Sequence, residues 1–97
     1  MIYTAEQKLI AEIIHVFDKI PVAVIKVKRD RILTQGQEIR IVSKPNPKTG
    51  RPKIDFKQVV KRMQINHQDI QEANDPNVEV GLQVDQKVKE GCCIFEV

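Results

Sequence analysis

The sequence predicts an all-β fold, a small antiparallel barrel, on three observations. Residues 78–84 alternate apolar and polar side chains with a period of two, which is typical of a strand with one buried face. Only 4% of the 97 residues are aromatic, so the core must be built from Val, Ile and Leu, and β-branched residues favour strands. The pattern L-x-x-G-x-x-I of residues 33–39 returns as V-x-x-G-x-x-I at residues 88–94, which indicates two strand–turn–strand units.

Four segments are expected strands, because apolar side chains alternate with polar ones along each of them. In chain order these strands are residues 22–28, 38–42, 78–84 and 92–97. In the second, Ile39 and Ile41 face the core and Arg40 faces solvent. Residues 74–77 (NDPN) are expected to turn the chain, because Asn, Asp and Pro are favoured in turns.

Two segments fit either a helix or a strand. Residues 4–18 have apolar side chains at helical spacing and begin with a sequence similar to a capping box, but they are also rich in Ile and Val. Residues 56–66 contain apolar positions that match both periods. Periodicity alone leaves both segments open. For residues 1–8, a flexible tail and a short helical turn both fit.

Charge is distributed unevenly along the chain. The net charge is +3, but residues 26–62 hold twelve basic and three acidic side chains, a net charge of +9. Residues 1–25 have a net charge of −1 and residues 63–97 of −5. The basic block is typical of a protein that binds a polyanion. The acidic C-terminal third is expected to face solvent or a protein.

Residues 44–54 are expected to form a long basic hairpin loop. Residues 44–53 hold three prolines, one glycine and four basic residues, a composition that suits neither a strand ladder nor a core. Proline stiffens such a loop into an extended conformation that can reach into a groove of structured RNA. Phosphate contacts are expected from ten basic side chains of this block. They are Arg29, Arg31, Arg40, Lys44, Lys48, Arg51, Lys53, Lys57, Lys61 and Arg62.

The residues that could carry catalysis or bind a metal ion do not form a recognisable set. Cys92 and Cys93 are adjacent and without further cysteines, so we expect two free thiols in a reducing cytoplasm. His15 is expected to be partly buried in a strand and His67 to lie in a turn. The sequence holds no Gly-rich phosphate loop, no membrane-spanning run and no secretory signal. We therefore expect a non-enzymatic cytoplasmic protein without cofactor, metal ion, GTP or membrane contact.

Four stretches taken together resemble a known group of small β-barrels. They are HVFDKIPVAVIKV (15–27), GQEIRI (36–41), QVVKRMQINHQDIQEA (58–73) and VEVGLQVDQKVKEGCCIFEV (78–97). In this order they resemble the second domain of translational GTPases such as elongation factor Tu, and more closely the stand-alone translation elongation factor-like proteins. They are also similar to the related C-terminal domain of the collagenase-like peptidase and RNA-hydroxylase family. The resemblance departs from the family at both turns, which read Gly36-Gln37 and Gly91-Cys92 instead of Gly-Asp.

The resemblance implies a closed six- or seven-stranded antiparallel barrel, with residues 1–97 as one domain and strands at residues 11–17 and 56–66. It also implies a function in translation, as an accessory ribosomal protein or a factor that binds ribosomal RNA or a ribosomal subunit, with ribosomal proteins as further partners. The alternative is a protein-interaction barrel that docks in trans on an RNA-modifying or peptidase-like enzyme. In that case the acidic C-terminal third is the expected interface.

Overall fold

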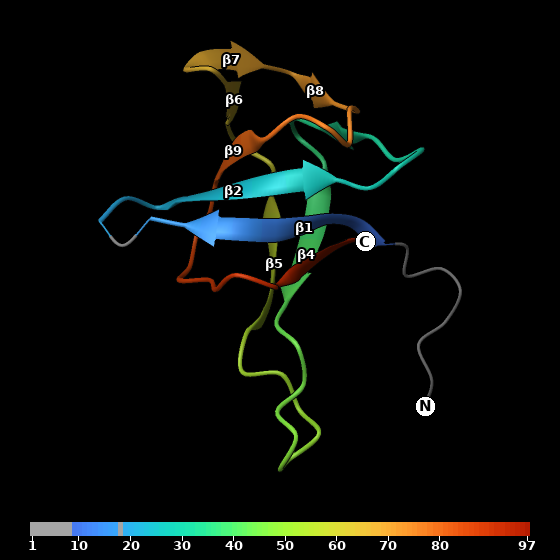
Figure 1. Cartoon of the computed structure of the whole chain (residues 1–97), viewed down its shortest axis with the longest axis vertical. Coiled ribbons are helices and arrows are strands. Elements are labelled where there is room, and N and C mark those ends of the chain that lie inside the picture. The colour runs from blue at the N-terminus through green and yellow to red at the C-terminus, as the bar shows by residue number, and fades with distance from the viewer. Residues whose placement is uncertain (1–8, 18) are drawn as a thin grey trace.

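The computed structural model describes residues 9–17 and 19–97, and this part of the chain is all-β without a helix (Figure 1). The expected tail, residues 1–8, lies outside the described residues. The strands are β1 (Leu9–Val16), β2 (Val22–Val27), β3 (Leu33–Thr34), β4 (Glu38–Val42), β5 (Asp55–Val59), β6 (Met63–Ile65), β7 (Gln68–Ile70), β8 (Glu72–Ala73), β9 (Val80–Gln83) and β10 (Cys93–Glu96). Eight of them form one antiparallel sheet in the order β5-β4-β10-β1-β2-β9-β6-β7, and β3 pairs with β8.

The main sheet curls on itself but does not close. Its two edges are β5 and β7, which are joined by no ladder among the described residues. Figure 1 shows β4 and β5 behind β1 and β2 and crossing them, so the two halves of the sheet face each other. The closed six- or seven-stranded barrel was therefore a wrong expectation, and the observed fold is an open, eight-stranded half-barrel.

The sheet stays open where the chain passes from β5 on one edge to β6 near the other. In this link, Val60 accepts a hydrogen bond from the Gly36 amide and donates one to the Gln37 carbonyl, each 2.8 Å long. The Gln83 amide donates to the Arg62 carbonyl at 3.0 Å. The link thus uses isolated hydrogen bonds on either side in place of a continuous ladder.

A buried glutamine bridges the part of the gap that the backbone does not close. Gln58 on β5 is only 5% exposed. Its Nε2 donates to the Gln83 carbonyl at 3.0 Å and to the Val59 carbonyl at 3.3 Å, while its Oε1 accepts from the Asp85 amide at 2.9 Å. A single side chain therefore connects edge strand β5 to the end of β9.

The core lies between the two halves of the curled sheet and consists largely of aliphatic side chains, as the composition predicted. The inward Ile39 and Ile41 are fully buried, whereas Arg40 is only half-buried, which confirms the predicted face of β4. The largest fully buried side chains come from both halves of the sheet. They are Ile10, Ile13, Ile25, Leu33, Ile39, Ile41, Met63, Leu82, Ile94, Val27, Val60 and Val80.

The first ambiguous segment contains a strand, and bulges explain its misleading spacing. The pairing of β1 shifts register between Leu9 and Ala11 against β10, and between Ile13 and His15 against β2. A bulge adds one residue and breaks the period of two, so Ile10 and Ala11 are both buried although they are adjacent. The second bulge leaves His15 exposed, and the expectation that it is partly buried was wrong.

Two short turns form where the sequence predicted them. Asn66 and His67 have φ angles of 51° and 64°, which is the pair of positive values that a type I′ hairpin between β6 and β7 needs. Asp75 accepts hydrogen bonds from the Asn77 amide at its Oδ1 (2.9 Å) and from the Val78 amide at its carbonyl (3.2 Å). Both predicted turns are confirmed.

Gly36 and Gly91, the glycines of the sequence repeat, have φ angles of 91° and 89°, so the repeat marks two turns that need glycine. Gly36→Ala should lower the free energy of unfolding by about 1–2 kcal/mol, because its Cβ meets no atom within 4 Å and only backbone strain acts. Gly81→Ala is the matched control. Its Cβ would lie 3.5 Å from Val22 Cγ1 at an ordinary φ, so a change within about 0.5 kcal/mol is expected. If urea unfolding shows the same loss in the free energy of unfolding for both variants, the positive φ of Gly36 is not the cause of the destabilisation.

Candidate functional site

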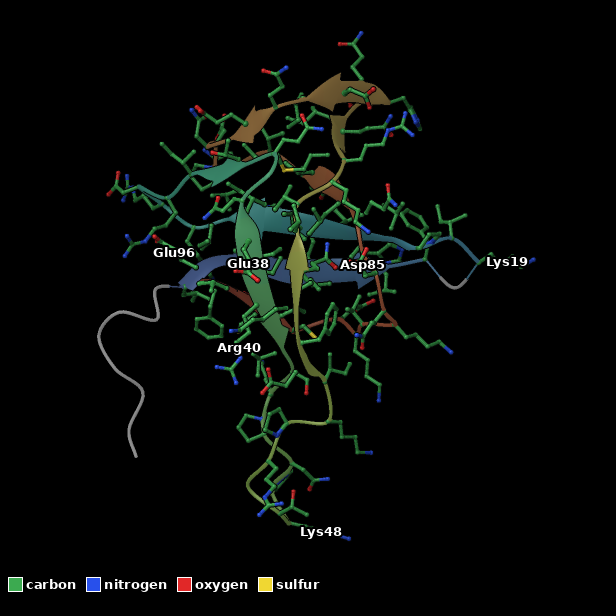
Figure 2. The ribbon with its side chains drawn as sticks, turned by 180° about the vertical axis from the view of Figure 1, so that it is seen from behind. Lys19, Glu38, Arg40, Lys48, Asp85 and Glu96 are labelled. Atoms are coloured by element: carbon green, nitrogen blue, oxygen red, sulfur yellow. The ribbon has the colours of Figure 1, made fainter. Side chains whose placement is uncertain are left out.

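The basic loop is a folded hairpin that projects from the body of the protein. Figure 1 shows it extending beyond β4 and β5 along the long axis, and Figure 2 places Lys48 at its tip. The Asn46 amide donates to the Arg51 carbonyl at 2.9 Å, and Asn46 Oδ1 accepts from the Lys48 amide at 2.8 Å. At its base Pro45 pairs with Pro52 as an isolated bridge. The expected loop therefore has more internal pairing than its composition predicted.

The ten predicted phosphate-binding side chains come from three parts of the fold. Arg29 and Arg31 lie in the turn between β2 and β3, and Lys61 and Arg62 lie in the link between β5 and β6. The other six lie on the unit made by β4, the hairpin and β5. They are Arg40, Lys44, Lys48, Arg51, Lys53 and Lys57.

Arg40, on the outer face of β4, is held by a carboxylate of the neighbouring strand. Its Nε and Nη2 donate to the two carboxylate oxygens of Asp55 at 2.7 and 2.6 Å. This hydrogen bond holds the pKa of Asp55 below its usual value of 3.8, and the positive charge of Arg40 acts in the same direction. Arg40 is thus already engaged within the protein.

Asp55→Asn tests this pair through its pH dependence. A lowered pKa in the folded state stabilises the protein above the usual pKa, and this stabilisation is lost as pH falls through the lowered pKa. Since both side chains are partly exposed, we expect the wild type to be more stable than the variant by about 0.5 kcal/mol at neutral pH. Urea unfolding should show this difference shrink as pH falls below the usual pKa of 3.8 and vanish once the pH is below the lowered pKa. A difference that persists in acid would contradict the assignment.

Two further cations of the predicted set also have acidic partners. Lys61 Nζ lies 2.9 Å from Asp85 Oδ1, and Arg62 Nε lies 2.9 Å from Asp69 Oδ1. Hydrogen bonds from Arg62 and Gln64 lower the pKa of Asp69. Within the described part of the chain, seven of the ten cations make no ion pair, and their role as phosphate contacts stays a prediction. They are Arg29, Arg31, Lys44, Lys48, Arg51, Lys53 and Lys57.

A groove of about 370 Å³ lies between the hairpin and the outer face of the sheet. Its floor consists of two cross-strand pairs of β10 and β4, Cys93 opposite Val42 and Phe95 opposite Arg40. Its wall is the base of the hairpin and consists of Ser43, Lys44, Pro45, Gly50 and Pro52. The groove therefore combines an apolar floor with cationic side chains at its border.

The adjacent cysteines, Cys92 just before β10 and Cys93 at its start, differ in burial, as expected for extended backbone, and both are free thiols. Cys92 is buried in the core, whereas Cys93 is half-buried in the floor of the groove. Burial raises the pKa of the Cys93 thiol, and the negative charge of Glu12 acts in the same direction. Cys93 is thus a neutral, weakly polar part of the floor near neutral pH.

The two ends of the molecule differ in charge, although Asp69 at the end opposite the hairpin is paired with Arg62. Residues 44–53 carry four cations and no carboxylate, and they form the hairpin at one end of the long axis (Figure 1). Residues 63–79 carry no Lys or Arg and build the β6–β8 region at the other end. The carboxylates of this acidic end are Asp69, Glu72, Asp75 and Glu79.

Other kinds of site were sought among residues 9–17 and 19–97. No three His, Cys, Asp or Glu side chains of this part lie close enough together to hold a metal ion. It also contains no helix with the length and apolarity needed to span a membrane. His15 Nδ1 lies 3.6 Å from Glu90 Oε2, and both side chains are more than half exposed.

Comparison with known proteins identifies the fold. No protein-family model and no curated protein sequence matches the chain. Two crystal structures are similar to it, both of the C-terminal domain of a U32 peptidase-like protein from Geobacillus thermoleovorans, one of them a selenomethionine variant. Each has a TM-score of 0.73 and 12% sequence identity. They cover 92% and 100% of this chain, and each match spans 99% of the domain.

These structures correct the family and the function that the sequence resemblance implied. The similar domains belong to a peptidase-like protein, so the assignment to the translation elongation factor-like family was wrong. The expected link to translation, ribosomes and ribosomal RNA is overturned with it. The stretches that suggested it form strands and tight turns in this chain, such as β6–β7 and β9. The chain has the fold of a C-terminal domain from a peptidase-like protein.

Proposed function

We propose that this protein is a protein-interaction domain that docks in trans on a peptidase-like enzyme and has no catalytic activity of its own. The observation that carries the proposal is the match over 99% of a C-terminal domain from a peptidase-like protein. A fold that is covalently attached in one protein can act as a separate subunit in another. Because fold alone does not give function, the proposal also depends on the surface.

The surface supports docking in a defined orientation. The hairpin at one end of the molecule carries four cations that make no ion pair with the described residues, and residues 63–79 at the other end carry carboxylates and no Lys or Arg. Charges that are separated in this way steer a partner and select one orientation of the complex. The apolar groove beside the hairpin offers area that a partner can desolvate.

The chemistry of the side chains supports a non-catalytic role. A nucleophilic cysteine needs a lowered pKa, whereas burial raises the pKa of Cys93. The pairs His15–Glu90, Lys61–Asp85 and Arg62–Asp69 are ion pairs at the surface. We place the protein in the cytoplasm, since free thiols suit a reducing compartment.

Sedimentation velocity tests this function directly. The purified chain is mixed in turn with each purified peptidase-like enzyme of the source organism. We expect the chain to co-sediment with one of these enzymes, and to show no peptide hydrolysis when it is assayed alone. If the chain sediments as a free protein with every enzyme, the docking function is wrong. Hydrolysis by the chain alone would refute the non-catalytic role.

A further inference from the structure

We propose that the groove between the hairpin and β10 binds an extended acidic segment of the partner, with one apolar side chain of that segment on Phe95 and Cys93. This inference rests on the proposed docking function and adds the contact surface and the chemistry of the partner. The floor, the charges at the border and the arrangement of the hairpin each support it.

The floor of the groove favours an apolar group. Val42, Cys93 and Phe95 point outward from β4 and β10 and are only half-buried, although neighbouring Ile41 and Ile94 are fully buried. Covering this apolar area removes it from water, which is favourable for an apolar side chain of a partner. The volume of about 370 Å³ lies within the range of known ligand pockets.

The border of the groove favours negative charge. Lys44 lines the groove and makes no ion pair among the described residues. Its aliphatic stem packs over the turn at Gly91, where a Cβ would lie 3.7 Å from Cε of Lys44. Beyond it, Lys48, Arg51 and Lys53 continue the positive charge along the hairpin, which holds no carboxylate. A segment with several carboxylates is the complementary partner.

The combination of charge and apolar floor favours a peptide over a nucleic acid. A nucleic acid presents a phosphate at every nucleotide, whereas the floor of the groove is built from Val42, Cys93 and Phe95 and favours an apolar side chain. Arg40, a cation that lines the groove, already binds Asp55 on both carboxylate oxygens. An acidic peptide can place one apolar side chain on the floor and its carboxylates along the hairpin.

Fluorescence anisotropy with a synthetic peptide tests the proposal. The probe is a short labelled peptide with one central phenylalanine flanked by glutamates. One control peptide replaces the phenylalanine with glutamine, and a second replaces the glutamates with lysines. We expect only the probe to bind, with an affinity that falls as salt increases.

Lys44→Glu should weaken binding of the probe about ten-fold, because it replaces an attraction at the border by a repulsion. Lys19→Glu is the matched control. Lys19 undergoes the same charge change but lies in the turn between β1 and β2, far from the hairpin tip in Figure 2. Binding by this variant should equal that of the wild type. Glu79→Lys, at the acidic end, should also leave it unchanged.

Cys93 provides an independent measurement of where the probe sits. Since Cys92 is buried, a maleimide reagent should modify Cys93 first, and mass spectrometry can follow the rate. The probe peptide should slow this reaction, and the modified protein should no longer bind the probe. Cys93→Ser should resist modification, which identifies the modified site.

Several results would overturn the proposal. These are equal probe binding by the wild type and Lys44→Glu, or an unchanged rate of Cys93 modification with the probe present. Protection of Cys93 by an RNA oligomer or by self-association, with no protection by the probe, would also do so. Binding of the peptidase-like enzyme distinguishes a failure of the groove assignment from a failure of the docking function. If the enzyme binds wild type and Lys44→Glu equally, the groove is not the contact and the docking function stands. If it binds neither while the probe still requires Lys44, the docking function fails and the groove assignment stands.

Discussion

Gln58→Leu is expected to lower the free energy of unfolding by about 2–4 kcal/mol. Leu has a similar size but can make none of the three hydrogen bonds of Gln58. The Gln83 carbonyl and the Asp85 amide then lose their partner beside the core, at the place where the sheet has no ladder. Thermal unfolding should show a decrease in Tm of about 10–20 °C for a chain of this size.

Gln35→Ala is the matched control for this experiment. Gln35 Nε2 also donates to a backbone carbonyl, that of Lys61 at 2.8 Å, but this hydrogen bond is exposed. Its loss should change the free energy of unfolding by no more than about 0.5 kcal/mol. If Gln58→Leu unfolds like the control, the side chain does not hold β5 to β9, and the open sheet must be stabilised by packing alone.

Replacing residues 44–53 with Asn-Gly is expected to abolish docking and to preserve the fold. The Ser43 amide donates to the Ile54 carbonyl at 2.8 Å and the Ile54 amide donates to Ser43 Oγ at 3.0 Å, so these residues lie opposite each other where a two-residue type I′ turn can join the strands. The pairing of β4 with β5 starts beyond this point, at Val42 and Asp55, and the core side chains of both strands are untouched. The variant loses the whole positively charged hairpin and the wall of the groove.

Circular dichroism and thermal unfolding should therefore show a β-sheet protein with a Tm within about 5 °C of the wild type. Lys48→Ala alone is the control for a general charge effect. Because Lys48 lies at the tip and away from the groove, it should reduce docking only slightly. A large loss of Tm on shortening the hairpin would mean that the hairpin is part of the fold and not an added contact surface.

The regular strands were predictable from the sequence, and the irregular ones were not. β2, β4, β9 and β10 alternate buried positions with half-buried or exposed ones, so their period of two is visible in the residues. β1 contains two bulges, and each of them shifts the following side chains to the other face. The resulting spacing of apolar residues resembles that of a helix. The pattern of apolar and polar residues therefore cannot distinguish a bulged strand from a helix.

Closure of the sheet was not predictable for a different reason. Whether β5 pairs with β9 or stays an edge depends on how residues far apart in the chain meet in space. Gln58 sits in an alternating strand and reads as an ordinary polar position, yet it is buried and connects β5 to Gln83 and Asp85. No local pattern distinguishes it from the exposed Gln35.

The candidate site was predictable only in part. The hairpin was found from its prolines and basic residues, and its cations do project from the body of the protein. The groove was missed: Ile94 is the inward residue of β10, and Phe95 beside it lies on the outer face. Alternation around Ile94 puts Cys93 and Phe95 on the outer face together, and this could have indicated an exposed apolar area.

One measurement tests the docking function and its surface together. Sedimentation compares, in parallel, how the wild-type chain and the variant with the shortened hairpin bind the same peptidase-like enzyme. We expect the wild-type chain to form a complex with the enzyme. We expect the variant, folded and with a similar Tm, to sediment as free protein. Equal binding by both proteins, or no complex with the wild-type chain, would contradict docking through the hairpin and its groove.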